Sequence, residues 1–423
     1  MLRFAPSPTG DMHIGDLRIA ILNYIVAHQC GEDFIVRIED TDKECNIEGK
    51  DQEILDILAL FKIEYSQVIY QSQNIRFHAA MALQLLHEKK AFTCFCSDGW
   101  LDNKRHEAKE ANKAYHYDDA CRNLPAELVI DNTNPFTIRI TRPDEAIVIH
   151  DKIKGDLPFD PDTVDSFIIM NQDKTPTYNF SCGVDDMLSD ISLVIRDEKH
   201  INNTPKQEHI RRSLAYNKTI EFAHLPHISN DNEFSVKSLL EDGYLPEAIL
   251  NYLVLIGNEM PKEIFTMKEA IELFDLSKVS KDPTLFDINR LKDINKKHLK
   301  NLDLKELSRY VGFADEEIGS LASLYLDEVS TTKDLKLKIA PIFSEHVIPK
   351  ELKEQVQIVS ECIKNAPYFE EYNDFKDYII KETQITEENL SKPLYLVLVN
   401  TESGPALSEI YKYLKNYLGE IVK

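Results

Sequence analysis

The residues best suited to chemistry stand near the start of the chain, where a turn rich in proline and glycine leads directly into a helical pattern. Residues 3–15 read Arg-Phe-Ala-Pro-Ser-Pro-Thr-Gly-Asp-Met-His-Ile-Gly. A turn that feeds a helix N-terminus gathers free backbone N–H groups and the positive end of the helix dipole. We therefore expect a nucleotide phosphate to bind at this turn.

The elements that must position this turn follow from the spacing of apolar residues. A half-buried helix is predicted from four apolar residues at steps of three and four, namely Ile14, Leu17, Ile21 and Tyr24. Gly31 is expected to end that helix as its C-cap. The apolar run over residues 34–38 then predicts a strand, and the sequence Glu-Asp-Thr-Asp follows it. This alternation is typical of a nucleotide-binding α/β domain.

Three charged residues occupy the ends of apolar, strand-like runs, where open α/β sheets bind their ligands. Arg3 and Arg196 have the planar fork that holds a carboxylate, and Glu39 offers an anion that suits an ammonium group. Considered without further context, each of these residues fits a structural ion pair better than a substrate site. The residues alone leave both interpretations open.

The opening motif, together with Arg-Ile-Glu-Asp-Thr-Asp at residues 37–42, resembles the glutamyl-tRNA synthetases of bacterial type. These are class I enzymes that activate glutamate with ATP and transfer it to tRNA. Other blocks that resemble the family in the expected order fall within residues 175–180, 184–186, 194–196, 202–207, 222–226 and 243–253. The resemblance covers nearly the whole chain.

This resemblance implies an α/β fold: a Rossmann-type class I synthetase catalytic domain with an α+β insertion, followed by an all-helical C-terminal anticodon-binding region. The catalytic domain would comprise residues 1–93 and 174–230, with the acceptor-end-binding insertion at 94–173. A stem-contact helical domain at 231–301 and the helical anticodon-binding domain at 302–423 would follow. Within the insertion, residues 136–140 and 146–150 flank a Pro-Asp turn and predict a β-hairpin.

The resemblance also assigns roles to individual residues. His13 and Gly15 would be catalytic, with His13 donating to phosphate oxygens and Gly15 allowing adenosine to approach the backbone. ATP, a substrate that brings Mg²⁺, would contact Pro6, Ser7, Pro8, Thr9, Gly10, Asp11, Met12, His13, Ile14, Gly15 and Asp16. Glutamate would be held by Arg3, Ser7, Glu39, Tyr178, Cys182 and Arg196.

One family motif is missing from this sequence. The lysine signature, Lys-(Met/Leu)-Ser-Lys-Arg, belongs between the His-Leu-Pro block and the Gly-Tyr-Leu-Pro block, but Asp231 follows Asn230 directly. Either the protein has lost the loop that stabilises the leaving pyrophosphate, or residues are missing from the sequence at this point. The intact flanks favour the second explanation. The first would favour a non-catalytic protein that binds tRNA or ATP.

A metal site is a further possibility within the insertion. Cys94, Cys96 and Cys121, with Tyr117 four residues before the last of them, resemble the zinc-site spacing of some family members. A structural zinc site needs four ligands, so Tyr117 would have to be the fourth. Three idle thiols are the alternative interpretation.

The amino-acid composition limits the partners and the cellular location that the protein can have. The 423 residues carry a net charge of −23, which argues against a nucleic-acid partner unless basic residues gather locally, as they do over residues 290–300. The resemblance places that run near tRNA(Glu), with tRNA(Gln) an open alternative.

Without a signal peptide or an apolar run of about 18 residues, we expect no membrane partner. Seven cysteines without a signal indicate reduced thiols and a cytoplasmic location, and the family expectation is a monomer.

Overall fold

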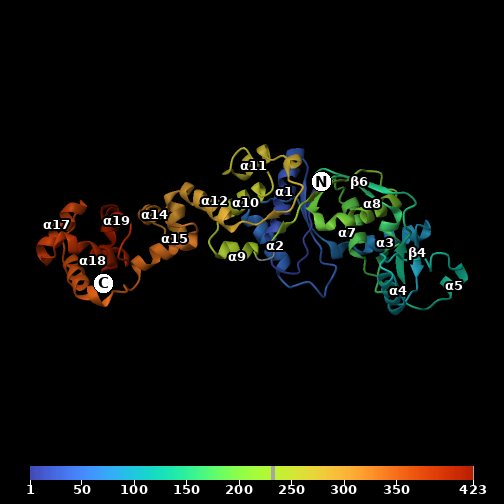
Figure 1. Ribbon diagram of the computed structural model, residues 1–423, viewed down its shortest axis with the longest axis horizontal. Helices are drawn as coiled ribbons and strands as arrows, with labels where there is room; N and C mark the ends of the chain where they lie inside the picture. Colours follow the sequence, from blue (N-terminus) through green and yellow to red (C-terminus); the bar gives the residue numbers. More distant parts are fainter. Residues whose placement is uncertain (230–233, 423) are drawn as a thin grey trace. The chain divides into compact units, whose positions relative to one another are not determined.

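The computed structural model describes residues 1–229 and 234–422 (Figure 1). The chain divides into two compact units, Met1–Val236 with Leu253–Phe286 and Lys237–Tyr252 with Asp287–Lys423. The first unit mixes strands and helices, whereas the described part of the second unit contains helices and no strands. The expected α/β region followed by an all-helical C-terminal region is therefore confirmed. The finer division into domains remains a prediction.

Two sheets in the first unit carry the residues of interest. One sheet is wholly parallel and has the order β1 (Leu2–Phe4), β2 (Phe34–Ile38), β3 (Val68–Tyr70). The other has the order β7 (Gly155–Phe159), β6 (Ile147–Asp151), β10 (Glu221–Leu225), β9 (Leu193–Asp197). β10 runs parallel to both β6 and β9. β1 and β9 lie side by side, and the N–H of Ser192 donates to the carbonyl of Met1 at 2.9 Å where they meet.

The predicted β-hairpin over residues 136–140 and 146–150 is wrong. β5 (Thr137–Ile140) pairs with β4 (Ala91–Cys94) and β8 (Ile168–Met170) in a separate antiparallel sheet. β6 instead pairs with β7 and β10. The physical reason is burial, because Ile147 and Ile149 pack into the core beneath β9 and β10 and draw β6 into that sheet. The Pro-Asp stretch is therefore a connection between two sheets.

The helix that follows the opening turn agrees with its prediction. α1 (Ile14–Cys30) buries Ile14, Leu17, Ile21 and Tyr24, and it ends at Gly31 in a left-handed conformation (φ 65°). The strand predicted at residues 34–38 is β2, and it is buried along its whole length. Because α1 is buried on nearly all sides, its N-terminus is held rigidly against the ends of the strands.

The remaining helices of the first part of the chain connect these strands (Figure 1). They are α2 (Lys50–Leu60), α3 (Ile75–His87), α4 (Asp98–Glu110), α5 (Ala126–Ile130), α6 (Pro161–Val164), α7 (Tyr178–Leu188), α8 (Thr204–Ser213) and α11 (Met267–Leu273). A short parallel pair, β11 (Ile228–Ser229) with β12 (Thr284–Leu285), lies after β10. α7 and α8 pack against each other, and each supplies residues to the site described below.

The other helices are α9 (Val236–Glu241), α10 (Pro246–Leu255), α12 (Ile288–Asn301), α13 (Leu304–Tyr310), α14 (Glu316–Ser323), α15 (Thr332–Ile339), α16 (Lys353–Lys364), α17 (Tyr372–Thr383), α18 (Glu387–Val399), α19 (Leu407–Leu414) and α20 (Leu418–Ile421). α12 buries Leu291, Ile294 and Leu299 and presents its basic residues outward. Across residues 1–229 and 234–422, no helix is both long enough and apolar enough to pass through a bilayer.

The second unit offers a direct test of its helix packing at Gly319, where α14 crosses α13. A Cβ on Gly319 would lie 1.8 Å from the backbone oxygen of Leu304, which cannot move without shifting α13. Gly319→Ala is therefore expected to cost about 2–3 kcal/mol, the usual cost of overpacking, and to lower the Tm of this unit by several degrees. The matched control is Gly419→Ala, where nothing lies within 4 Å. Equal calorimetric transitions for both variants would contradict the close α13–α14 contact.

Candidate active site

The turn before α1 is fixed by backbone hydrogen bonds from two neighbouring segments. The carbonyl of Pro6 accepts from the N–H of Glu39 at 2.9 Å, and that of Pro8 accepts from the N–H of Ile47 at 2.9 Å. The end of the turn pairs with the segment after residue 233, because the N–H of Val236 donates to the carbonyl of Met12. The predicted phosphate-binding turn is therefore a rigid element.

His13 caps α1 by its backbone conformation rather than by its side chain. Among the described residues, its Nδ1 is buried without a hydrogen-bond partner. An orphaned ring nitrogen at a helix N-terminus fits a role toward a bound anion. Ser7 is exposed on the turn, and in the described part of the chain its side chain has no hydrogen-bond partner.

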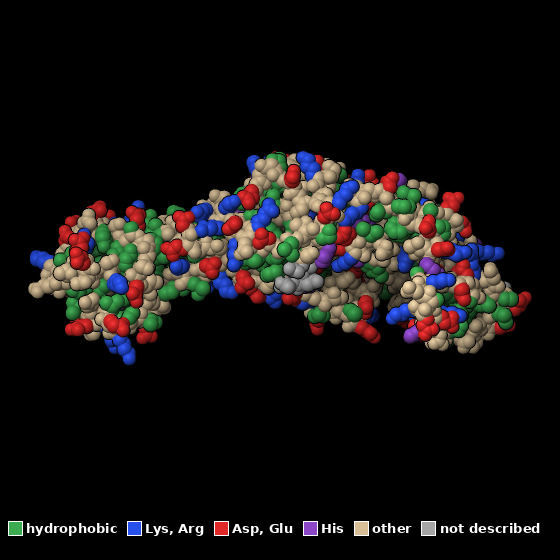
Figure 2. Space-filling view, viewed as in Figure 1, with side chains coloured by type: hydrophobic (Ala, Val, Ile, Leu, Met, Phe, Trp, Pro, Cys, Tyr) green, Lys and Arg blue, Asp and Glu red, His purple; other side chains and the backbone are tan. Residues whose placement is uncertain are grey.

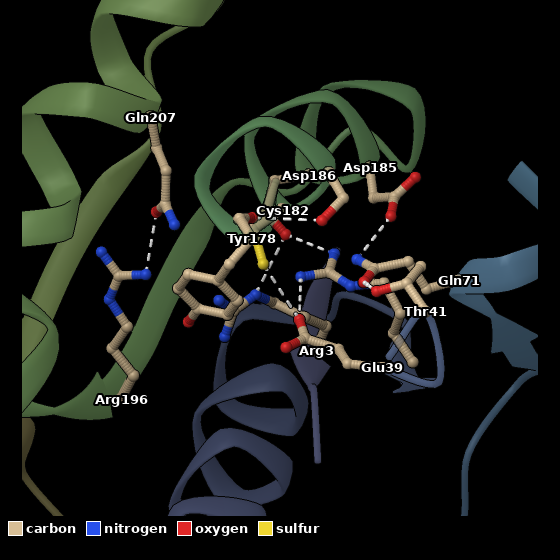
Figure 3. A network of polar contacts seen from close by, with 12 residues as sticks. Arg3, Glu39, Thr41, Gln71, Tyr178, Cys182, Asp185, Asp186, Arg196 and Gln207 are labelled. Carbon is tan, nitrogen blue, oxygen red and sulfur yellow. Dashed lines mark hydrogen bonds and ion pairs between the residues drawn. The ribbon is translucent and has the colours of Figure 1, made fainter. Parts of the chain in front are cut away.

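Four of the six residues predicted to hold glutamate are gathered at the carboxyl ends of the parallel strands (Figure 3). Arg3 comes from β1, Glu39 follows β2, and α7 supplies Tyr178 and Cys182. The thiol of Cys182 donates to Oε1 of Glu39 at 3.2 Å. Burial, reinforced by the Glu39 carboxylate, raises the pKa of this thiol well above its ordinary value. Cys182 is therefore a protonated hydrogen-bond donor rather than a nucleophile.

The sequence did not single out the pair of residues that links Arg3 to Glu39. Oδ1 of Asp186 accepts from Nε of Arg3 at 3.2 Å and from Nη1 of Arg37 at 2.5 Å. Nη2 of Arg37 donates in turn to Oε1 of Glu39 at 3.1 Å. Burial alone would raise the pKa of Asp186, but Arg3 and Arg37 hold it well below its ordinary range. Asp186 and Arg37 thus hold Arg3 and Glu39 in place. Figure 3 shows Asp186 beside Arg3 and Glu39.

Most of the hydrogen-bond donors of the Arg3 side chain have no partner among the described residues. Within the described residues, its only side-chain hydrogen bond is the one from Nε to Asp186. Its two terminal nitrogens carry the remaining donors, and those are the atoms that form a fork toward a carboxylate. This arrangement suits a residue that anchors at one edge and binds a ligand with the other.

Arg196, the sixth predicted residue, lies on the neighbouring strand β9 in a different electrostatic setting. Its side chain is buried and donates to Oε1 of Gln207 at 2.8 Å, to Oγ1 of Thr204 at 2.7 Å and to Nε2 of His224 at 3.2 Å. In the part of the chain that the structure describes, every one of its hydrogen-bond partners is neutral. A buried, uncompensated guanidinium is costly unless a ligand anion completes it.

The imidazole of His200, which lies near Arg196, is uncharged. Oη of Tyr178 lies 3.3 Å from Nδ1 of His200, and the two rings are 5.9 Å apart. Burial, together with the nearby Arg196 guanidinium, lowers the pKa of His200 to about 4. His200 is therefore neutral at physiological pH and adds no positive charge beside Arg196.

The predicted metal ligands are also brought together. The Sγ atoms of Cys94, Cys96 and Cys121 lie within 4.8 Å of one another, and that of Cys96 is 3.6 Å from that of Cys121. Oη of Tyr117 lies 3.4 Å from the sulfurs of both Cys94 and Cys96. Sulfurs around a tetrahedral zinc are about 3.8 Å apart. The three sulfurs therefore lie close enough to share one zinc ion, with the hydroxyl of Tyr117 beside them.

A cation already supports this cluster from outside. The guanidinium of Arg139 stacks 3.9 Å above the ring of Tyr117, and its Nη1 donates to the carbonyl of Ser166 at 2.8 Å. Burial opposes ionisation of Cys94, but Tyr117, the N–H of Cys96 and Arg139 hold its pKa below its ordinary value. Burial raises the pKa of Cys96 to about 12.

The missing lysine signature falls at Asn230 and Asp231, and both lie outside the described residues. Two charged residues near the site, Asp16 and Lys199, lie at the ends of helical segments. Asp16 is in the first turn of α1, where a carboxylate is favourable to the helix dipole. Lys199 follows β9 in a short turn that the carboxylate of Asp197 caps by accepting the N–H of Lys199.

Comparison with known proteins agrees with this geometry. Residues 1–293 match the family model described as tRNA synthetases class I (E and Q), catalytic domain. The fold is similar to that of a solved glutamate tRNA ligase from Elizabethkingia meningosepticum, with a TM-score of 0.82 and 24% identity over 99% of this chain and 97% of that chain. At this identity the structural likeness speaks for the fold alone.

Closer relatives are similar along their whole length. Glutamate–tRNA ligase 2 of Sulfurimonas denitrificans is 63% identical and glutamate–tRNA ligase 1 of Campylobacter jejuni 47% identical, each over 432 aligned positions that cover all of both chains. Since this chain has 423 residues, at least nine of those positions have no counterpart in it. The family model and the full-length relatives together show that the chain belongs to the glutamate–tRNA ligases, within the class I tRNA synthetases of the E and Q type.

Proposed function

We propose that the protein is a glutamate–tRNA ligase that activates L-glutamate with ATP and transfers it to the 3′-terminal adenosine of tRNA(Glu). The observation that carries this proposal is the buried guanidinium of Arg196, whose hydrogen-bond partners are all neutral. Such a cation suits the carboxylate of a small substrate. Arg3 offers a second fork nearby, and the relatives named glutamate–tRNA ligase match over their full length.

In this proposal the described residues act by position and charge. Arg3 and Arg196 hold the substrate carboxylates, Glu39 accepts its ammonium group, and the turn before α1 receives the ATP phosphates with His13. Mg²⁺ bound with ATP would offset phosphate charge. The glutamate carboxylate then attacks the α-phosphorus in line and pyrophosphate leaves, so no covalent enzyme intermediate is needed.

The tRNA partner is proposed from the parts of the chain beyond this site. The insertion would hold the acceptor end, and the outward basic residues of α12 suit the phosphates of the stem. On the face seen in Figure 2, acidic and basic side chains are interspersed. The chain as a whole carries a net charge of −23. Binding would therefore rest on local basic residues and fall steeply with salt.

The experiment is charging of labelled glutamate onto purified tRNA(Glu) and tRNA(Gln) in parallel, with ATP. Charging of tRNA(Glu) alone supports a discriminating ligase. Charging of both, or of tRNA(Gln) alone, supports the non-discriminating or tRNA(Gln)-directed alternative. Charging of neither would contradict the proposed activity.

A second candidate function is favoured by one specific observation, the missing lysine signature between Asn230 and Asp231. A chain that has lost this loop would bind ATP or tRNA without efficient catalysis. Retained ATP binding with no charging of either tRNA would support it. An intact mass larger than 48.7 kDa, the mass of these 423 residues, would show that the loop is present after all.

We propose zinc at Cys94, Cys96, Cys121 and Tyr117, supported by the spacing of the three sulfurs and the tyrosine hydroxyl. Bound zinc would be structural, joining β4 to the segment around Tyr117. Freshly purified protein is expected to hold about one zinc per chain, and Cys121→Ser is expected to lose most of it. The matched control is Cys362→Ser, which alters a thiol in α16.

The single tryptophan gives this prediction a second readout. Trp100 packs against the cluster that contains Cys94 and Tyr117, so chelation is expected to shift its fluorescence. A freshly purified protein with zinc well below one per chain would leave the three thiols as ordinary core residues.

We also propose that the protein acts as a monomer in the cytoplasm. The seven cysteines all lie in the described part of the chain and none of them forms a disulfide, which suits a reducing compartment. Light scattering coupled to size-exclusion chromatography should then give a mass near 48.7 kDa. A mass twice as large would contradict the monomer.

A further inference from the structure

His224 lies directly beside Arg196 on the neighbouring parallel strand. The register of β10 against β9 pairs the two residues, and both side chains are buried. Nε of Arg196 donates to Nε2 of His224 at 3.2 Å, and Oγ1 of Thr204 lies 3.0 Å from the same nitrogen. The imidazole therefore holds the Nε edge of the guanidinium.

This contact defines the protonation state of the ring. An arginine Nε always carries its hydrogen, so Nε2 of His224 must be the acceptor and its proton must sit on Nδ1. Nδ1 then donates to Oδ2 of Asp151 at 2.7 Å. Burial lowers the pKa of His224, although Asp151 opposes that shift, and the ring stays neutral. A second proton on Nε2 would face the hydrogen on Arg196 Nε directly.

Asp151 is itself held by the backbone. Its Oδ1 accepts the N–H groups of Ile153 at 2.9 Å and Lys154 at 2.7 Å, and its Oδ2 accepts the N–H of His224 at 3.0 Å. Four donors leave this carboxylate one orientation. Hydrogen bonds therefore connect Asp151 to His224 and His224 to Arg196. In this series the imidazole contacts the arginine and the carboxylate of Asp151 does not.

We propose that His224, oriented by Asp151, is a positioning residue that holds the Arg196 guanidinium for the substrate carboxylate without neutralising it. A carboxylate at this position would fix the arginine equally well, but it would cancel the charge that the substrate needs. A neutral imidazole supplies the geometry and leaves the cation available. The inference rests on the proposed function, because it assumes that glutamate is the ligand of Arg196.

Two substitutions test the two nitrogens of the imidazole one at a time. His224→Asn keeps a donor near the Nδ1 position toward Asp151 but removes the acceptor for Arg196. His224→Gln reaches the Nε2 position with an amide oxygen and restores that acceptor. Binding of L-glutamate to the full-length protein is measured by calorimetry, with Tm recorded for each variant. His224→Asn is expected to raise the Kd for glutamate about tenfold and His224→Gln less than about threefold, since one hydrogen bond to a charged group is at stake.

A third variant keeps the proposal testable if His224→Asn fails to fold. Asp151→Asn lets the ring take the other tautomer, in which Nε2–H opposes Arg196, so it is expected to weaken glutamate binding about tenfold as well. Unchanged glutamate affinity in the folded His224→Asn or Asp151→Asn protein, or equal weakening in His224→Asn and His224→Gln, would overturn this inference alone. Wild-type protein that binds no glutamate would overturn the proposed function, and this inference with it.

Discussion

Replacing Arg196 with alanine is expected to lower kcat/KM for glutamate in tRNA charging by about a hundredfold or more. The guanidinium is buried and, among the described residues, all its hydrogen-bond partners are neutral, so a substrate carboxylate would be the counter-charge that it binds directly. Truncating one partner of a buried, hydrogen-bonded charge pair costs about 3 kcal/mol, which corresponds to that factor. The KM for ATP should change little, because ATP is expected at the turn before α1.

The Tm of the Arg196→Ala protein should show whether the loss of activity comes from lost substrate binding or from a disrupted fold. Removing a buried cation whose hydrogen-bond partners are neutral relieves a desolvation cost, which offsets the loss of its hydrogen bonds to Gln207 and Thr204. Arg196→Ala is therefore expected to keep a Tm close to that of the wild type. Arg212→Ala removes an arginine from the exposed face of α8 and is the matched control, expected to leave both kinetics and Tm nearly unchanged. Near-normal glutamate kinetics in Arg196→Ala would remove this residue from the site.

The parts of the fold that follow local rules could be predicted from the sequence. α1 begins after the Pro/Gly turn and ends at Gly31 because apolar spacing and the C-cap glycine both specify that helix. The β-hairpin over residues 136–150 failed because strand pairing is decided by distant partners. β6 joins β10, about 70 residues later, through the burial of Ile147 and Ile149. A Pro-Asp turn carries no information about that choice.

In the site, too, the residues that belong to local sequence motifs were predictable, whereas their distant contact partners were not. Arg3, Glu39, Tyr178, Cys182 and Arg196 were identified from motifs, and the structure places them at strand ends or on α7. The residues that hold them were missed, because Asp186 binds Arg3 and Arg37, and His224 binds Arg196, from distant parts of the sequence. One signal was available: a charged residue inside an apolar strand, such as Arg37 in β2, needs a buried partner. The sequence could not say which carboxylate supplies it.

That partner is Asp186, and Asp186→Asn is expected to destabilise the protein by about 3 kcal/mol at pH 7. Within residues 1–229 and 234–422, the amide leaves the buried Arg37 with Glu39 as its one hydrogen-bonded carboxylate and leaves Arg3 with no ion pair. Breaking a buried pair by removing one charge costs this much because the other charge stays desolvated. The KM for glutamate should also rise, since Arg3 and Glu39 are anchored through the same carboxylate.

The pH dependence of this loss identifies its cause. The pKa of Asp186 is depressed in the folded state, so its contribution is present above the unfolded pKa of about 3.9 and is lost as pH falls toward the folded value. The difference in unfolding free energy between wild type and Asp186→Asn should therefore be constant from pH 5 to 8 and shrink below about pH 4. Asp190→Asn is the matched control, since that exposed carboxylate pairs with Lys218 at the surface and should affect stability little. A difference that persists unchanged into acid would mean that packing, rather than charge, makes Asp186 necessary.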